Sequence, residues 1–179
     1  MIDSKTVQKL RAETGAGVMD CKRALEESSG DFEKARDLLK QKGLAAAAKR
    51  SDRESREGVV ESYIHSGGRI GALVELSSEM DFVARNPEFR ELARNIAMQV
   101  AAMSPVVVSE DDLTPDARAD LLKEHGDEKK AIETAVLLRQ PYIRDNSKTV
   151  GDLVTALAAS TGENVRVRRF ARFQLGEAA

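Results

Sequence analysis

Residues 59–76 read Val-Val-Glu-Ser-Tyr-Ile-His-Ser-Gly-Gly-Arg-Ile-Gly-Ala-Leu-Val-Glu-Leu, and this stretch decides the fold class. From Ile70 to Leu76 apolar residues alternate with other residues, which is the period of a β-strand. Ser66-Gly67-Gly68 lies between two apolar runs and supplies the residue types of a tight turn. The stretch therefore predicts a β-hairpin.

A long helix is predicted directly after the hairpin. Asn86-Pro87 combines a capping residue with a proline at the first helical position, which is a typical helix start. The apolar residues that follow fall on one helical face, namely Phe89, Leu92, Ala93, Ile96, Ala97, Val100 and Met103. Residues 105–140 are acidic and predict a solvated helical pair. Thr149, with Asp152 three residues later, predicts the start of another helix.

A last strand is expected near the end of the chain. Val165, Val167, Ala171, Phe173 and Leu175 are assigned to its core face, and Arg166, Arg168 and Arg172 to the other. Arg169 and Phe170 break the alternation, which indicates either a β-bulge or a two-sided strand. With about three strands and many helices, the predicted class is α+β, with a small antiparallel sheet packed by helices.

The first 43 residues predict three short helices separated by glycine-containing breaks, among them Gly15 and Gly30. Asp31 is placed to cap the third helix, and Gly43 stands where its end is expected. Residues 44–56 favour a helix but offer no wide apolar face, so they are interpreted as a linker helix. The expected division is a helical module over 1–43, the linker over 44–56 and an α+β core over 57–179.

Composition excludes several classes of protein. The 179 residues include 28 Lys and Arg and 30 Asp and Glu, so the net charge of −2 is too balanced for a strongly basic nucleic-acid binder. No apolar run approaches the roughly 18 residues that span a membrane, and the first residues lack a signal-peptide core. A cytoplasmic protein without membrane contact is expected.

Few residues suggest catalysis or metal binding. Cys21 is the single cysteine, and with His65 and His125 it gives too few ligands for an obvious metal site. Cys21 is a conceivable nucleophile of a hydrolase or transferase, but it falls on the apolar stripe of the second helix, where a buried thiol is unreactive. The glycines form neither a P-loop nor a dinucleotide motif, so no cofactor is expected.

Two further segments carry alternatives. Arg166, Arg168, Arg169 and Arg172 form a basic cluster that is typical either of RNA binding or of a solvated strand face. Residues 78–86, Ser-Glu-Met-Asp-Phe-Val-Ala-Arg-Asn, place a carboxylate beside an aromatic ring in a connection. Ser78 and Asp81 also have the spacing of a capping box, with Phe82 entering the core. Both interpretations of Phe82, exposed functional ring and core residue, remain open.

Two stretches together resemble bacterial elongation factor Ts, the nucleotide exchange factor of elongation factor Tu. Residues 10–25, Leu-Arg-Ala-Glu-Thr-Gly-Ala-Gly-Val-Met-Asp-Cys-Lys-Arg-Ala-Leu, are similar to the N-terminal signature of that family, and residues 79–86 to its Thr-Asp-Phe-Val-Ala-Arg-Asn motif. Shorter matches extend the resemblance over nearly the whole chain: Tyr63-Ile64-His65, Gly68-Arg69-Ile70-Gly71, Gln140-Pro141-Tyr142, Ser147-Lys148-Thr149-Val150 and Arg169-Phe170-Ala171-Arg172-Phe173.

The resemblance implies an N-terminal module like a ubiquitin-associated domain, a linker helix and an α+β core. It implies guanine nucleotide exchange in translation elongation, without catalytic residues, because an exchange factor makes and breaks no covalent bond. By analogy, Arg11, Val18 and Met19 contact the G domain of Tu, while Asp81 and Phe82 reach its magnesium and phosphate site. The alternative function is that of an adaptor or an RNA-binding module of the translation machinery.

The chain departs from the family pattern at Met80, where the family usually has threonine, and a thioether cannot supply that hydroxyl. Val18, where methionine is common, keeps an apolar contact. The chain also carries one copy of a core that longer relatives duplicate. Because short members of the family are thought to pair, the resemblance implies a homodimer that faces two Tu molecules.

Overall fold

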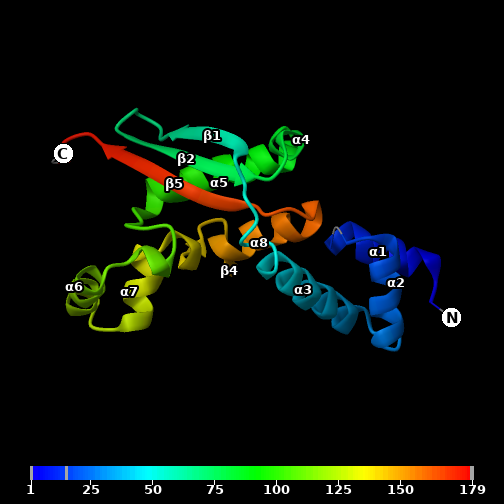
Figure 1. The fold of residues 1–179 in the computed structure, drawn as a ribbon. Coiled ribbons are helices and arrows are strands. Elements are labelled where there is room, and N and C mark those ends of the chain that lie inside the picture. Colours follow the sequence, from blue (N-terminus) through cyan, green and yellow to red (C-terminus); the bar gives the residue numbers. More distant parts are fainter. Residues whose placement is uncertain (1, 15, 178–179) are drawn as a thin grey trace. The chain divides into compact units, whose positions relative to one another are not determined.

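The computed structural model describes residues 2–14 and 16–177, which form two compact units (Figure 1). One unit contains the chain up to residue 53 together with residues 155–164. The other contains residues 54–154 and those from 165 onwards. Helices combined with a small antiparallel sheet confirm the predicted α+β class. Gly15, expected to break the first helix, lies outside the described residues.

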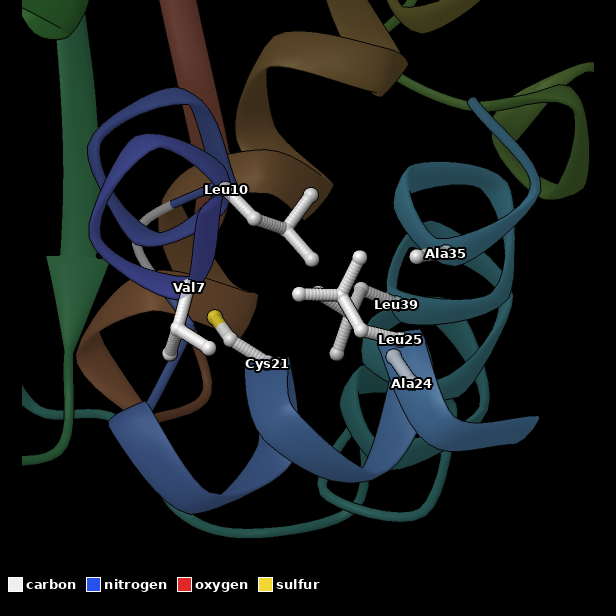
Figure 2. Close-up of a cluster of buried hydrophobic side chains, with 7 residues drawn as sticks. All are labelled: Val7, Leu10, Cys21, Ala24, Leu25, Ala35 and Leu39. Carbon is white, nitrogen blue, oxygen red and sulfur yellow. The ribbon is translucent and has the colours of Figure 1, made fainter. Parts of the chain in front are cut away.

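Three helices form the N-terminal part of the first unit: α1 (Ser4–Thr14), α2 (Val18–Glu27) and α3 (Phe32–Ala48). Figure 2 shows the small cluster of side chains that these helices bury between them: Val7, Leu10, Cys21, Ala24, Leu25, Ala35 and Leu39. Asp31 caps α3 as predicted, because its carboxylate accepts a hydrogen bond from the backbone N–H of Lys34. That bond lowers the pKa of the Asp31 carboxyl.

The separate helix expected over residues 44–56 is not formed. Helix α3 continues through Gly43 to Ala48, and residues 49–56 form turns and irregular chain that lead into the first strand, which begins at Glu57. Gly43 therefore does not end a helix. A Cβ atom on Gly43 would lie 3.0 Å from the Cβ of Ala159, so the glycine allows close packing within the first unit.

The predicted hairpin is confirmed as β1 (Glu57–Ile64) and β2 (Ile70–Ser78), which pair antiparallel. Strand β5 (Arg166–Gln174) adds to the other edge of β2, so the sheet order is β1-β2-β5. Helix α5 (Pro87–Met103) packs on all three strands (Figure 1). Asn86 caps it by accepting a hydrogen bond from the Glu88 N–H, as predicted. Met103, assigned to its buried face, is exposed instead.

Of the two alternatives for β5, the bulge is the one present, and it reverses the faces of the residues after it. Leu76 pairs with Val167 and Glu75 with Arg169, so Arg168 is the extra residue. Beyond the bulge Arg172 points toward α5, where its Nε donates to the carbonyl of Ala101 at 3.2 Å. Phe173 points the other way and is 68% exposed. The assignment of Ala171, Phe173 and Leu175 to the core face is therefore wrong.

The segment after α5 contains short elements, which are η1 (Glu110–Asp112), α6 (Pro115–His125), α7 (Glu128–Ala135), η2 (Leu137–Arg139), β3 (Pro141–Tyr142), β4 (Asp145–Thr149) and α8 (Val150–Thr161). The expected helical pair is confirmed as α6 and α7, although α7 buries Ala131, Ile132 and Ala135. Thr149 and Asp152 form the predicted reciprocal cap of α8. Inside the second unit, the fully buried side chains of Gln99 and Gln140 are hydrogen bonded at 3.1 Å.

Candidate functional site

A single helical turn, α4 (Asp81–Ala84), connects the end of β2 to α5 and carries the most suggestive sequence motif. Ser78 at the end of β2 is fully buried, and its hydroxyl donates to the Met80 carbonyl at 3.1 Å. Val83 and Ala84 are buried on the inner side of the turn. The connection is thus anchored at both ends, while the side chains of Met80, Asp81 and Phe82 are exposed.

The ring of Phe82 is 63% exposed, so the interpretation of Phe82 as a core residue is wrong. The capping box is also absent, because Ser78 bonds to the Met80 carbonyl and Met80 occupies the N-cap position. Burying a phenylalanine side chain is worth about 1.5–3 kcal/mol, and the folded chain leaves much of this free energy unused. Met80 and Phe82 are both exposed on this anchored turn, so the turn presents apolar surface to a partner.

Asp81 forms an ion pair with Arg85, one helical turn later, with 2.6 Å between Oδ2 and the guanidinium nitrogen. Both side chains are well exposed to water. Such exposed pairs contribute only about 0–1 kcal/mol because water screens the two charges. The Asp81 carboxylate therefore exchanges this partner for another at little cost in free energy.

Met80 stands at the N-cap of α4 with extended backbone angles, and it makes no side-chain capping hydrogen bond. We expect Met80→Thr to raise the free energy of unfolding by about 1 kcal/mol, because a threonine hydroxyl accepts from a backbone N–H of the first turn. Urea unfolding measures this change. Met80→Val is the matched control, since valine has the same shape without the hydroxyl. Equal stability of the two variants would contradict this account of the cap.

The other predicted contact residues lie on the helical module. Arg11 is an exposed residue in the last turn of α1. Val18 and Met19 are the first two residues of α2, and they are 51% and 63% exposed. The buried stripe of α2 begins at Cys21, almost one turn further into the helix than Val18. Both apolar side chains are therefore available to a partner.

The structure weakens two of the alternative functions. Cys21 is fully buried, and its thiol lies 3.7 Å from the Ala16 carbonyl, so it cannot reach a substrate. In the C-terminal cluster, the Glu75 carboxylate pairs with both Arg168 and Arg169, and Arg172 pairs with Glu177. These ion pairs neutralise much of the positive charge with which the arginines would bind the phosphates of an RNA backbone.

Two other features are absent from the part of the chain that the structure describes. Among residues 2–14 and 16–177, no group of three His, Cys, Asp or Glu side chains is arranged to hold a metal ion. Within the same ranges, no helix has the length and apolar character needed to cross a bilayer.

One surface was missed by the sequence analysis, namely the face of the sheet opposite α5. Its exposed apolar side chains, which we call the outer sheet face, are Val60, Ile64, Leu73, Phe173 and Leu175. Four of them, Ile64, Leu73, Phe173 and Leu175, line a hollow of about 500 Å³. Gly71 lies between Ile64 and Phe173, and a Cβ atom there would come within 2.7 Å of Ile64. If the alternation of side chains along β5 is counted onward from Phe170, after the bulge, Phe173 and Leu175 fall on this face.

Comparisons with known proteins agree with the resemblance. The family model described as elongation factor TS matches residues 5–125. Elongation factor Ts of Carboxydothermus hydrogenoformans is 50% identical over 99% of this chain and 90% of its own length. That of Caldanaerobacter subterraneus subsp. tengcongensis is 47% identical over 99% of this chain and 98% of its own length. The chloroplastic protein of Guillardia theta is 47% identical over 98% of this chain and 90% of its own length. The chain therefore belongs to the elongation factor Ts family of translation elongation factors.

Proposed function

We propose that this chain is a guanine nucleotide exchange factor that acts on elongation factor Tu in the cytoplasm. The observation that carries the proposal is the exposed ring of Phe82 beside the Asp81 carboxylate, on a turn that Ser78 and Val83 anchor. The family membership supports elongation factor Tu as the partner. The two side chains reach the magnesium and phosphate site of Tu and promote the release of GDP.

Exchange requires differential binding rather than covalent chemistry. The factor must bind nucleotide-free Tu tightly and nucleotide-bound Tu weakly, and the coupling between factor and nucleotide is reciprocal. A 10⁴-fold loosening of GDP corresponds to about 5.5 kcal/mol of coupling free energy. Burial of the Phe82 ring supplies about 1.5–3 kcal/mol of contact energy, so the remainder comes from loss of the electrostatic interactions at the magnesium ion.

The residues divide this work between two surfaces. Phe82 displaces side chains of Tu near the metal, and Asp81 disturbs the network around the phosphates. Arg11, Val18 and Met19 bind the G domain of Tu and raise the effective concentration of Phe82 at its own contact. The exposed, weakly paired state of Asp81 favours this role, because the Arg85 pair is easily replaced.

The direct test follows a fluorescent GDP analogue as it leaves purified Tu. Adding this chain with excess unlabelled nucleotide is expected to accelerate the release, with a rate that rises with factor concentration. The magnesium chelator EDTA, added without the factor, gives the rate of release from a disrupted metal site. Release that stays at the spontaneous rate at all factor concentrations would contradict the proposed function.

The proposal includes a homodimer formed through the outer sheet face. Its exposed apolar side chains are concentrated on the three strands, and such patches are typical of protein interfaces. The hollow lined by Gly71 and Phe173 can receive a side chain of a second copy. A twofold axis through this face makes the contact self-complementary.

Phe173→Glu is expected to convert the dimer into a monomer at micromolar concentration, raising the dimer dissociation constant about 100-fold or more. The reason is that each copy would bury an unpaired carboxylate in an apolar contact. Analytical ultracentrifugation measures the change. Val106→Glu is the control, because Val106 is 62% exposed but lies outside the outer sheet face. Sedimentation of the Phe173→Glu variant as a dimer would exclude this face as the interface.

A further inference from the structure

Met80 adjoins the two residues proposed to act on Tu, and its side chain is 51% exposed. Its backbone is fixed by two hydrogen bonds to its carbonyl, from the Ser78 hydroxyl at 3.1 Å and from the Val83 N–H at 3.2 Å. The thioether is thus held at the surface at the start of α4, next to Asp81 and Phe82. Because both side chains are exposed on the same short connection, we expect a partner that covers the Phe82 ring to approach this sulfur.

We propose that Met80 is an oxidation-sensitive residue of the contact surface, and that its conversion to the sulfoxide by a peroxide weakens nucleotide exchange. This inference rests on the proposed exchange function. The sulfur lone pair attacks one peroxide oxygen, so that an S–O bond forms while the O–O bond breaks. The hydroxide that leaves takes up the remaining proton and becomes water. Sulfur loses two electrons, and the peroxide is reduced by the same two.

The product changes the character of the surface. A thioether is flexible and apolar, whereas a sulfoxide is polar and has a strongly hydrogen-bonding oxygen. Placing such a group in a dry contact beside Phe82 leaves the oxygen without water, which disfavours the bound state. The effect is reversible, because methionine sulfoxide reductases restore the thioether.

Met80 differs from another methionine of the same unit in its surroundings. Met98 on α5 is half-buried, and its sulfur accepts a hydrogen bond from the Arg144 guanidinium at 3.7 Å. Met103 is 42% exposed at the end of α5, away from the α4 turn in the sequence. Met98 is therefore expected to oxidise more slowly than Met80, and Met103 serves as an exposed methionine outside the proposed contact.

The experiment uses the full chain in a Met19→Leu background, because Met19 is also exposed. The protein is treated with hydrogen peroxide, the peroxide is removed, and peptide mass spectrometry follows the sulfoxide at each methionine. GDP release from untreated Tu is then measured, and each variant is compared with its own untreated sample. The ratio of treated to untreated rate constants is expected to fall about fivefold or more when Met80 is present.

Two further variants and one enzyme complete the test. Adding Met80→Leu is expected to keep the ratio near one, whereas adding Met103→Leu is expected to leave the peroxide-induced loss unchanged. Methionine sulfoxide reductase is expected to restore the lost rate. Full exchange by protein whose Met80 is completely oxidised, or an equal loss in the Met80→Leu variant, would overturn the inference. Failure of the untreated chain to accelerate GDP release would instead contradict the proposed function itself.

Discussion

Replacing Phe82 with alanine is expected to lower the second-order rate constant for factor-promoted GDP release from Tu by about 100-fold, a size typical of losing a central aromatic contact. The stability of the fold should change little, because the ring is 63% exposed and the turn is anchored by Ser78, Val83 and Ala84. The melting temperature is therefore expected to stay within about 2 °C of the unsubstituted chain. Stopped-flow release of a fluorescent GDP analogue and thermal unfolding measure the two effects.

Leu122→Ala is the matched control for loss of an exposed apolar side chain. Leu122 is 43% exposed on α6, and it lies in neither of the proposed Tu contacts. Its replacement is expected to leave the release rate unchanged. An unchanged rate in the Phe82→Ala variant would remove the ring from the mechanism. A fall of 10 °C or more in its melting temperature would show that the ring stabilises the fold instead.

The elements that could be predicted from sequence are those whose signals are local. The structure confirms two predicted helix caps, one at Asn86-Pro87 and one formed by Thr149 with Asp152. In each cap the residues lie within three positions of each other in the chain. The hairpin of β1 and β2 follows from the strict alternation over Ile70–Leu76 and from the turn residues that precede it. None of these predictions depends on which distant segment packs against the element.

The predictions that failed depend on distant partners or on a single-residue shift. Gly43 has the sequence signal of a helix end, but its role is close packing against Ala159, which lies more than a hundred residues away. At Arg168 one extra residue reverses every later side chain of β5, so Phe173 moved from the expected core to the surface. The pattern indicated a bulge without fixing the register after it.

The candidate site was only partly predictable for the same reason. The segment from Ser78 to Phe82 has the spacing of a capping box, and local spacing cannot show whether a ring points inward or outward.

The buried pair of Gln99 and Gln140 gave no signal at all, because a single polar residue on an apolar helical face is interpreted as a surface position. Its partners come from a segment about forty residues later.

This glutamine pair ties α5 to the segment that follows α7. The Gln99 amide nitrogen donates to Gln140 Oε1 and to the Pro141 carbonyl, both at 3.1 Å, and its oxygen accepts from the Ile143 N–H at 3.0 Å. The Gln140 amide nitrogen donates to the Thr134 carbonyl at 2.7 Å. Both side chains are fully buried, so water cannot replace a partner that is lost.

Gln99→Leu is expected to lower the free energy of unfolding by about 3 kcal/mol, because it unpairs the buried Gln140 oxygen and the half-buried backbone groups of Pro141 and Ile143, at up to roughly 1–3 kcal/mol each. That is a large share of the roughly 5–15 kcal/mol that stabilises a typical domain. Urea unfolding measures the change. Gln41→Leu is the control, because Gln41 is exposed on α3 and its replacement should change stability by less than about 0.5 kcal/mol.

The double variant Gln99→Leu with Gln140→Leu decides whether the pair itself carries this stability. Gln99→Leu alone leaves the buried Gln140 oxygen without its hydrogen bond from Gln99, whereas the second substitution removes that oxygen. The decreases in the free energy of unfolding of the two single variants are therefore expected to add up to about 1–2 kcal/mol more than the decrease in the double variant. Strict additivity would mean that each glutamine acts only through its backbone partners.

At temperatures where the Gln99→Leu chain is folded, its promotion of GDP release should be unchanged, since Phe82 and its anchors are untouched. Phe82→Ala and Gln99→Leu thus separate exchange from stability, because each is expected to alter the property that the other leaves intact.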